Sequence, residues 1–257
     1  MILVLGGTKD GRDLAALLTE KGYPVVVSVF SDYGRDLIQL DKELVHTGPL
    51  DTDGFISFIG INHIHLIVDA SHPYAINVSQ NAMKACQSTG ISYVRYERPK
   101  APLPAYHGLH VVHDYDEAAK MASALGKVVF LTTGSRHLKL FKNTSCLQNH
   151  RLIARVLPEP SVLTECLSLG FKPKDIVAMQ GPFSHNLNIA LFQEYNTEVI
   201  ITKNSGQIGG SDTKITAAMS LNLPLVMIDR PVIPYHNVVY DMEDVIKFIR
   251  EVHKCTI

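Results

Sequence analysis

The stretch Ile2-Leu3-Val4-Leu5-Gly6-Gly7-Thr8-Lys9-Asp10-Gly11-Arg12 decides the fold of this chain. It opens with four consecutive apolar residues, which is typical of a short buried strand. A glycine-rich turn follows, and beyond it Leu14 and Leu18 lie on one face of a predicted helix. A strand that turns through glycines into a helix opens the dinucleotide-binding α/β domains. The spacing is not GxGxxG, so the loop alone also fits a glycine turn that only tightens the connection.

Strand-like and helix-like segments alternate over the rest of the chain, which predicts an α/β protein with largely parallel sheets. The alternation breaks after Arg98, where Pro99, Pro102 and Pro104 disfavour both helix interior and central strand. We therefore predict two Rossmann-like domains, residues 1–98 and 109–257, joined by a proline-rich linker at 99–108. The active site is expected in the cleft between the two domains.

The composition excludes several classes of protein. With 46% apolar and 19% charged residues among 257, the chain is suited to a folded globular core. Lys plus Arg number 24 and Asp plus Glu 25, so the net charge of −1 provides no chain-wide attraction for nucleic acid or an anionic membrane. No apolar run approaches the ~20 residues that span a bilayer, and the first residues do not resemble a signal peptide. We expect a cytoplasmic protein.

The cysteines and histidines do not indicate a metal site. Cys86, Cys146, Cys166 and Cys255 are scattered without CxxC spacing, and the twelve histidines form no HExxH motif. We predict reduced thiols and no bound metal.

In the first half of the chain, polar residues follow the predicted strands. Asp69-Ala70-Ser71-His72-Pro73-Tyr74 follows the predicted fourth strand, which in the common doubly wound order lies beside the first. Ser71 is predicted to cap the next helix, at 75–88, with Pro73 in its first turn. Another helix is predicted at 33–40. The cap does not explain why a histidine stands next to Ser71.

Three strand ends of the second half are also small and polar, and the carboxyl ends of parallel strands meet at one edge of a sheet. We therefore expect a binding rim there, formed by residues 132–136, 180–184 and 203–206. Cationic side chains gather at the same edges in both halves, which favours a ligand with several carboxylates or phosphates. They are Arg95, Arg98, Arg136, Lys139, Lys203, Lys214 and Arg230.

Six segments in series resemble the precorrin-6A reductases of cobalamin biosynthesis, and together they extend over nearly the whole chain. They are Leu3-Val-Leu-Gly-Gly-Thr-Lys-Asp-Gly-Arg, Asp69-Ala-Ser-His-Pro-Tyr-Ala, Leu131-Thr-Thr-Gly-Ser, Gln180-Gly-Pro-Phe-Ser, Thr202-Lys-Asn-Ser-Gly and Ile228-Asp-Arg-Pro. The resemblance implies a two-domain enzyme that reduces precorrin-6A, or its cobalt form, to precorrin-6B. It also implies NADPH or NADH as cofactor, with hydride passing from the nicotinamide to C19 of the macrocycle.

The resemblance also implies roles for particular residues. The first domain is expected to hold the dinucleotide, through Gly6, Gly7, Thr8 and Lys9, with Ser71 and His72 near the nicotinamide. His72 is the candidate proton donor. The second domain is expected to hold the tetrapyrrole, whose fringe of carboxylates would account for the cations. The expected substrate contacts are Arg98, Thr133, Ser135, Gln180, Lys203, Ser205 and Arg230.

Several alternatives stay open at this point. Ser31 with Arg35 suits the 2′-phosphate of NADPH, whereas Asp32 suits the ribose hydroxyl of NADH. The substrate is metal-free or carries cobalt, and the protein is a monomer or a small homo-oligomer. Rival functions are an S-adenosylmethionine-dependent methyltransferase and a non-enzymatic nucleotide-sensing module. Thr8-Lys9 suits a phosphate better than a sulfonium cofactor, and a second polar rim argues against the sensor.

Overall fold

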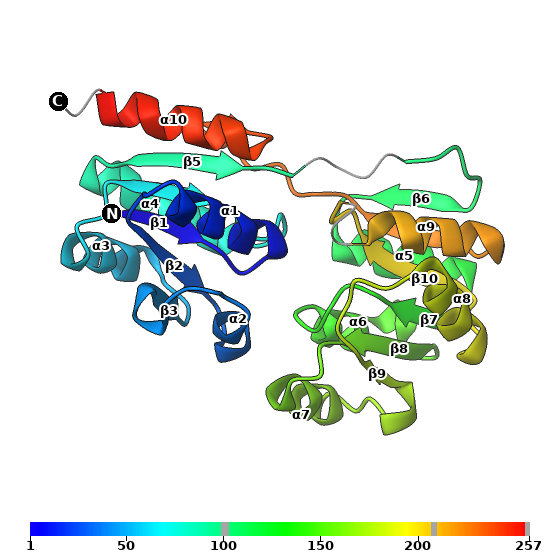
Figure 1. The fold of residues 1–257 in the computed structure, drawn as a ribbon. Coiled ribbons are helices and arrows are strands. Elements are labelled where there is room, and N and C mark those ends of the chain that lie inside the picture. The colour runs from blue at the N-terminus through cyan, green and yellow to red at the C-terminus, as the bar shows by residue number, and fades with distance from the viewer. Residues whose placement is uncertain (99–102, 207–209, 255–257) are drawn as a thin grey trace. The chain divides into compact units, whose positions relative to one another are not determined.

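The computed structural model describes residues 1–98, 103–206 and 210–254, and their contacts divide the chain into two compact units (Figure 1). The first unit contains the described residues up to Arg98 and those from Pro231 onward. The second contains the described residues from Leu103 to Arg230. Each unit is built on its own six-stranded sheet.

Every strand pair of the first sheet is parallel, and β4 lies beside β1 as the sequence predicted. Leu5, the last residue of β1, pairs in register with Asp69, the last residue of β4. The loops that follow these two strands therefore start at the same edge of the sheet. The strand order is β12 (Val238–Val239), β5 (Ser92–Tyr96), β4 (Leu66–Asp69), β1 (Ile2–Leu5), β2 (Val25–Val29) and β3 (Val45–Thr47).

Side chains alternate between the two faces of this sheet, and each face has its own helices (Figure 1). Ile2 and Val4 pack with α1 (Lys9–Glu20) and α10 (Met242–Lys254). Leu3 and Leu5 pack with α3 (Thr52–Ile61) and α4 (Ile76–Thr89) on the other face. The first strand is thus buried on both faces, which explains its unbroken apolar sequence.

The C-terminal segment corrects the predicted domain boundary. We assigned residues 109–257 to one domain, but β12 pairs with β5, and α10 packs on β5 and β12 of the first sheet. Val245, Ile246 and Ile249 supply the buried face of α10. A two-residue strand leaves no periodic pattern in the sequence, so its pairing with residues more than a hundred positions away was not visible there.

The predicted helix at 33–40 is also shorter than expected. Helix α2 covers only Asp32–Asp36, and the 3-10 helix Lys42–Leu44 lies before β3. Ile38 and Leu40 both pack against the core of the first unit. Residues two positions apart point to the same side in an extended chain but to different sides in a helix. The helix therefore ends before Ile38.

The second sheet repeats the arrangement, again with all strand pairs parallel. Helices α8 (His185–Glu194) and α9 (Ser211–Ser220) cover one face, over a core that includes Ile153, Phe130 and Ile200. The other helices are α5 (Tyr115–Leu125), α6 (Leu138–Asn143) and α7 (Pro160–Ser168). The strand order is β6 (Leu109–Val112), β11 (Leu225–Ile228), β10 (Val199–Lys203), β7 (Val128–Leu131), β8 (Arg151–Val156) and β9 (Ile176–Ala178).

The predicted linker at 99–108 divides into two parts. Residues 99–102 lie outside the described residues. Residues 103–108 belong to the second unit, where the Tyr106 hydroxyl donates to the carbonyl of Leu223 at 2.9 Å. The described part of the linker is therefore attached to the second unit.

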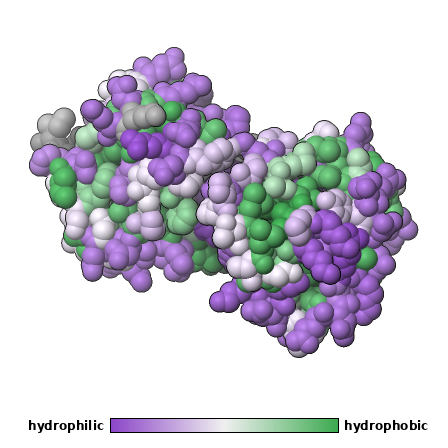
Figure 2. All heavy atoms as spheres, turned by 90° about the horizontal axis from the view of Figure 1, so that it is seen from below, coloured by the Kyte–Doolittle hydropathy of each residue, from purple (hydrophilic) through white to green (hydrophobic). Residues whose placement is uncertain are grey.

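Polar side chains cover much of the surface seen in Figure 2, with smaller apolar areas between them. Among the described residues, no helix is both long and apolar enough to cross a bilayer. Cys86 and Cys166 are buried free thiols and Cys146 is half-buried, whereas Cys255 lies outside the described residues.

Candidate functional site

The loop between β1 and α1 depends on glycine at two positions for packing. A Cβ on Gly11 would lie 2.6 Å from the Cα of Gly6, and a Cβ on Gly6 would lie 2.5 Å from Cγ1 of Val27. Cβ atoms in proteins essentially never approach other atoms this closely, so a side chain at either position would force its neighbours to shift. A Cβ on Gly7 would meet nothing within 4 Å. Gly6 and Gly11 thus let the loop fold back on its own helix, whereas Gly7 leaves the outer side of the loop open.

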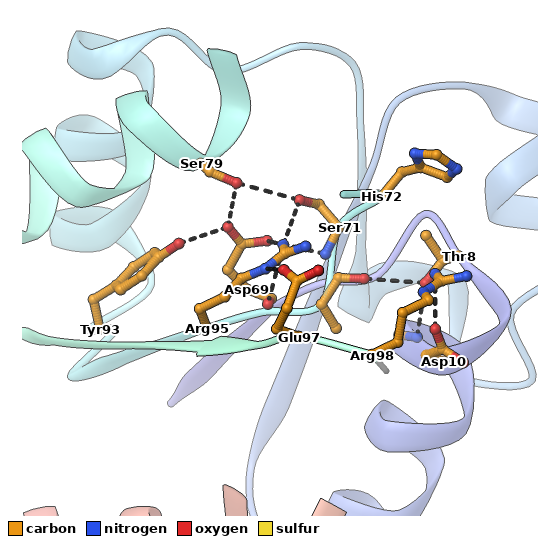
Figure 3. Close-up of polar contacts among 12 residues, drawn as sticks. Thr8, Asp10, Asp69, Ser71, His72, Ser79, Tyr93, Arg95, Glu97 and Arg98 are labelled. Carbon is orange, nitrogen blue, oxygen red and sulfur yellow. Dashed lines mark hydrogen bonds and ion pairs between the residues drawn. The ribbon is translucent and has the colours of Figure 1, made fainter. Parts of the chain in front are cut away.

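Thr8 begins α1 and connects two loops (Figure 3). Its hydroxyl oxygen accepts a hydrogen bond from the backbone N–H of Gly11 at 3.1 Å and donates one to the carbonyl of Ala70 at 3.0 Å. The loops after β1 and β4 are therefore held together, as the predicted site requires. Lys9, in contrast, is exposed and forms an ion pair with Asp13 at 2.6 Å, which raises its pKa.

Ser31 and Arg35 lie after β2, the strand beside β1 on the other side from β4. The Ser31 hydroxyl accepts from the backbone N–H of Gly34 at 3.3 Å and caps the short helix that carries Arg35. The predicted dinucleotide residues therefore follow three adjacent strands, β2, β1 and β4, at one edge of the first sheet.

A polar network at this edge surrounds Asp69, which is fully buried (Figure 3). Its Oδ2 accepts hydrogen bonds from the hydroxyls of Ser79 and Tyr93, each at 2.6 Å. Its Oδ1 accepts from Nη1 of Arg95 at 2.9 Å. Burial by itself raises the pKa of Asp69, but the charge of Arg95 and the hydrogen bonds more than offset this, so the pKa lies below its usual value. Asp69 is a buried carboxylate that stays ionised.

Arg95 joins this network to Glu97. Its Nε donates to Glu97 at 2.8 Å, and its guanidinium lies 5.3 Å from the centre of the Tyr235 ring. Burial opposes the charged guanidinium, yet Asp69 and Glu97 outweigh it and raise the pKa of Arg95. We placed Arg95 among the cations that meet a ligand. With 1% of its surface exposed, it is instead a structural partner of two carboxylates.

The structure also corrects the predicted role of Ser71 in starting a helix. Helix α4 begins at Ile76 after Ala75, without a side-chain cap, and Pro73 precedes it. The backbone N–H of Ser71 donates to Asp69 at 2.9 Å, and its hydroxyl accepts from Arg95 at 3.1 Å. The buried carboxylate and guanidinium are stronger partners than a helix end, so Ser71 fixes the loop rather than the helix.

His72 follows Ser71 and points away from the Asp69 network (Figure 3). Its Nδ1 accepts a hydrogen bond from the backbone N–H of Tyr74 at 3.3 Å. A nitrogen that accepts carries no proton, so this bond assigns the proton of the neutral ring to Nε2. The imidazole is half-buried and has one nitrogen suited to donate.

Arg98 forms an ion pair that the sequence did not suggest. Its guanidinium lies 2.7 Å from a carboxylate oxygen of Asp10, and both side chains are buried in the first unit. Asp10 stands in the first turn of α1, so the pair ties the end of this half to the glycine loop. The predicted contact of Arg98 with a substrate carboxylate stays a prediction.

The predicted substrate residues of the second unit lie at or just after the carboxyl ends of β7, β9, β10 and β11, which share one edge because all pairs are parallel. Some already have partners there. The N–H of Ser205 donates to the Ser211 hydroxyl at 3.1 Å, and Nε of Arg230 donates to the Asn204 carbonyl at 2.9 Å. Buried Thr133 has a hydroxyl without a hydrogen-bond partner among the described residues. Ser135 and Gln180 lie in the loops after β7 and β9.

Lys203 ends β10 in a strongly positive environment. Burial, and to a smaller extent the nearby charge of Arg136, lower its pKa to about 8. Burial together with the charges of Lys203 and Arg136 also lowers the pKa of His137. The ring of His137 stacks on that of Tyr115, with 3.6 Å between the ring centres. The expected gathering of cations is therefore present at this edge.

The sequence interpretation missed Asp69, Tyr93 and Arg155 as polar core residues. Arg155 lies within an apolar-looking strand, Arg151–Val156, and is 6% exposed. An arginine in the middle of a buried strand was the available signal, because such a residue needs a polar partner.

Comparison with known proteins gives one consistent result. Residues 1–250 match the family model described as precorrin-6x reductase CbiJ/CobK. The chain is 39% identical to the cobalt-precorrin-6A reductase of Priestia megaterium over 96% of both chains. It is 35% identical to that of Salmonella typhimurium over 90% of this chain and 87% of the relative. A solved structure, CobK precorrin-6A reductase, aligns over 98% of this chain and 96% of its own, with a TM-score of 0.79 and 27% identity.

Proposed function

The chain belongs to the precorrin-6x reductase family, and from that premise we propose that it reduces precorrin-6A, or cobalt-precorrin-6A, with a nicotinamide dinucleotide. The observation that carries the proposal is the family match over residues 1–250, nearly the whole chain. The enzyme is an oxidoreductase of cobalamin biosynthesis. The family therefore decides against the methyltransferase and the nucleotide sensor.

The β1–α1 loop supports a dinucleotide as the hydride donor. The start of a helix favours an anion through its N–H groups and its positive end. Gly7 leaves the outer side of the loop open, so a phosphate can approach the backbone there. We assign Gly6, Gly7, Thr8 and Lys9 to the phosphates of the cofactor, Gly6 by shaping the loop and Lys9 by its exposed charge.

The residues after β2 favour NADPH over NADH. Ser31 and Arg35 offer a hydroxyl and a guanidinium at the position where Rossmann-like domains meet the ribose of the adenosine half. Asp32 is the competing signal, since a carboxylate prefers the free 2′-hydroxyl of NADH. We propose NADPH because two groups suit the 2′-phosphate and one opposes it.

When bound, the nicotinamide supplies a hydride, which we propose passes to C19 of the macrocycle, and a proton completes the addition of two hydrogens. The chain itself has to align two large planar molecules and balance their charges. Ser71, held by Asp69 and Arg95, fixes the loop that carries His72. We assign Nε2 of His72 as the donor of the proton, since Nδ1 is occupied as an acceptor.

The edge of the second unit supplies the proposed contacts with the tetrapyrrole. Its carboxylates would pair with Lys203 and Arg230, and its remaining polar groups with the hydroxyls and amide nearby. The positive environment of Lys203 supports this assignment, because an anion raises the lowered pKa of that lysine towards its ordinary value. The neutral groups of the set are Thr133, Ser135, Gln180 and Ser205.

The test is anaerobic incubation of the purified protein with cobalt-precorrin-6A or metal-free precorrin-6A, with NADPH or NADH deuterated at C4. We expect oxidation of the dinucleotide and a macrocycle heavier by two hydrogens, of which one is deuterium. Absence of both changes with either substrate and either dinucleotide would contradict the proposal. The cytoplasmic location and the state as a monomer or small homo-oligomer stay predictions.

A further inference from the structure

On the face of the second sheet that packs against α8 and α9, the side chains change from apolar to polar towards the carboxyl ends of the strands. Ile153, Phe130 and Ile200 form one cross-strand row, and each is fully buried. Two residues farther along, Arg155, Thr132 and Thr202 continue on the same face, because strand side chains alternate. The interior beneath α8 and α9 therefore contains a polar layer.

Arg155 brings a positive charge into this layer. Its Nη1 donates to Oδ1 of Asn188 at 2.8 Å, and its guanidinium lies 4.1 Å from the centre of the Phe183 ring. Within the described part of the chain, Arg155 forms no ion pair. Burial lowers its pKa to about 10, so it is still protonated at neutral pH. A buried guanidinium that meets only a neutral amide and aromatic faces is costly for the folded protein.

Lys214 of α9 is the second cation of the layer. It is 6% exposed and interacts electrostatically with Arg155 and Lys203, and the nearby carboxylate of Asp212 opposes them only in part. Burial together with the two like charges lowers its pKa to about 7. Like charges in an interior repel each other, and an anion between them removes that cost.

Thr202 adds a hydrogen-bond donor to the same face. Its side chain is fully buried, with a relative exposure of 0%. Its hydroxyl has no hydrogen-bond partner among the described residues. Helix α9, which carries Lys214, begins at Ser211 after Gly210, without a side-chain cap. Its positive end favours an anion at the same edge of the sheet.

We propose that Arg155, Lys214 and Thr202 form an interior subsite for an oxyanion of a ligand of this enzyme. The anion is a carboxylate of the tetrapyrrole, because the proposed function assigns the macrocycle to this unit and the dinucleotide phosphates to the first unit, and in this the inference rests on the proposed function. A phosphate of the dinucleotide is the other outcome that the test distinguishes. The three side chains supply a guanidinium, an ammonium and a hydroxyl donor, which is the chemistry that both anions share. Arg155 and Thr202 stood outside the residues that the sequence assigned to substrate.

Two variants test the subsite. Lys214→Met keeps the length of the side chain and removes its charge, and Thr202→Val keeps the shape and removes the hydroxyl. Lys120→Met, on the exposed face of α5, is the matched control. Calorimetry gives the dissociation constants of cobalt-precorrin-6A, of NADPH and of inorganic pyrophosphate, each titrated alone.

We expect Lys214→Met to weaken the binding of one of the two natural ligands by at least about tenfold. Thr202→Val should weaken the binding of the same ligand by a smaller factor. Loss of macrocycle binding identifies a carboxylate, and loss of NADPH and pyrophosphate binding identifies a phosphate. The thermal midpoint of Lys214→Met should be unchanged or raised, because the repulsion of Arg155 is gone. Affinities equal to those of wild type for all three probes in both variants would overturn the subsite.

A measurement on the folded wild-type protein covers the case in which the variants do not fold. Affinity for the identified anion should fall from about pH 6 to about pH 9, as Lys214 loses its proton. The titratable and charged groups that face Lys214 and its helix are Arg155 of β8, Lys203 of β10 and His185 of α8, besides Asp212 of α9 itself. Since Lys203 titrates near pH 8, the experiment is repeated in Lys203→Met, where the decline should persist. A flat profile there contradicts the subsite.

The outcomes separate the two proposals. If wild type does not reduce the macrocycle but pyrophosphate binds and depends on Lys214, the proposed reaction fails and the subsite stands. If wild type reduces the macrocycle and both variants bind every probe as wild type does, the subsite fails and the reaction stands. If wild type binds none of the three probes, the subsite is contradicted directly.

Discussion

Nη1 of Arg95 lies 2.9 Å from Oδ1 of Asp69, and neither side chain is more than 1% exposed. The pair joins the ends of two neighbouring strands, β4 and β5, and both of its members hold Ser71. The loop that bears His72 therefore depends on a charge pair that no solvent reaches.

Asp69→Asn should lower the free energy of unfolding by about 3–5 kcal/mol, because it leaves the buried guanidinium of Arg95 without its main partner. Chemical denaturation measures the change. Asp13→Asn is the matched control, since it removes a carboxylate from the exposed pair with Lys9 and should leave the stability unchanged. Equal effects in the two variants would contradict a structural role for the Asp69 pair.

Stability should also fall in acid because of Asp69. Its pKa in the folded protein is lower than in the unfolded chain, so its contribution is present above the unfolded value of about 3.8. That contribution is lost as the pH falls below this value towards the folded pKa. Denaturant titrations of wild type and Asp69→Asn between about pH 6 and about pH 3 test this. Their difference in free energy should shrink on acidification, and a constant difference would contradict it.

Gly11 and Gly7 should respond differently to substitution by alanine. Gly11→Ala brings a Cβ within 2.6 Å of the Gly6 backbone, so we expect a loss of about 1–3 kcal/mol in the free energy of unfolding. Gly7→Ala meets no atom within 4 Å and should leave the stability almost unchanged. If phosphates bind over Gly7, the same variant weakens NADPH binding, which calorimetry measures. Equal stability losses for both variants would show that the loop packs otherwise.

Arg35→Ala should change the preference between dinucleotides. We expect the KM for NADPH to rise by about tenfold and the KM for NADH to stay constant, because only NADPH carries the 2′-phosphate. Asp32→Asn provides the opposite control and should raise the KM for NADH alone. Steady-state rates with both dinucleotides measure this, and parallel changes for both would remove Arg35 from the proposed phosphate contact.

His72→Ala should lower kcat by about a hundredfold or more if its Nε2 delivers the proton. Any dependence of kcat on pH that arises from this proton transfer should disappear with it. His107→Ala, an exposed histidine of the second unit, is the control and should leave both unchanged. Full turnover with an unaltered pH profile in His72→Ala would end the assignment of His72 as proton donor.

Local pattern was enough for most of the elements and for the edge of each sheet to which the candidate residues belong. The apolar run of β1, the glycine turn and the leucine face of α1 are all encoded within twenty residues, so the strand-turn-helix unit was readable directly. Polar loops after alternating strands then predicted the carboxyl edges of both sheets correctly, because parallel strands place all such loops on one side. The order of motifs along the chain also pointed to the family.

Contacts between distant residues were decided only by the tertiary structure. The sequence by itself determined that β1 is a strand, that Ser71 and His72 follow β4, and that cations gather near strand ends. Folding alone brought β12 to β5, turned Arg95 from a rim cation into the partner of Asp69, and brought Arg155 near enough to Lys214 for their charges to interact. The physical reason is that hydrophobic periodicity acts over neighbouring residues. Strand pairing and the compensation of buried charge depend instead on which strands and helices pack against each other.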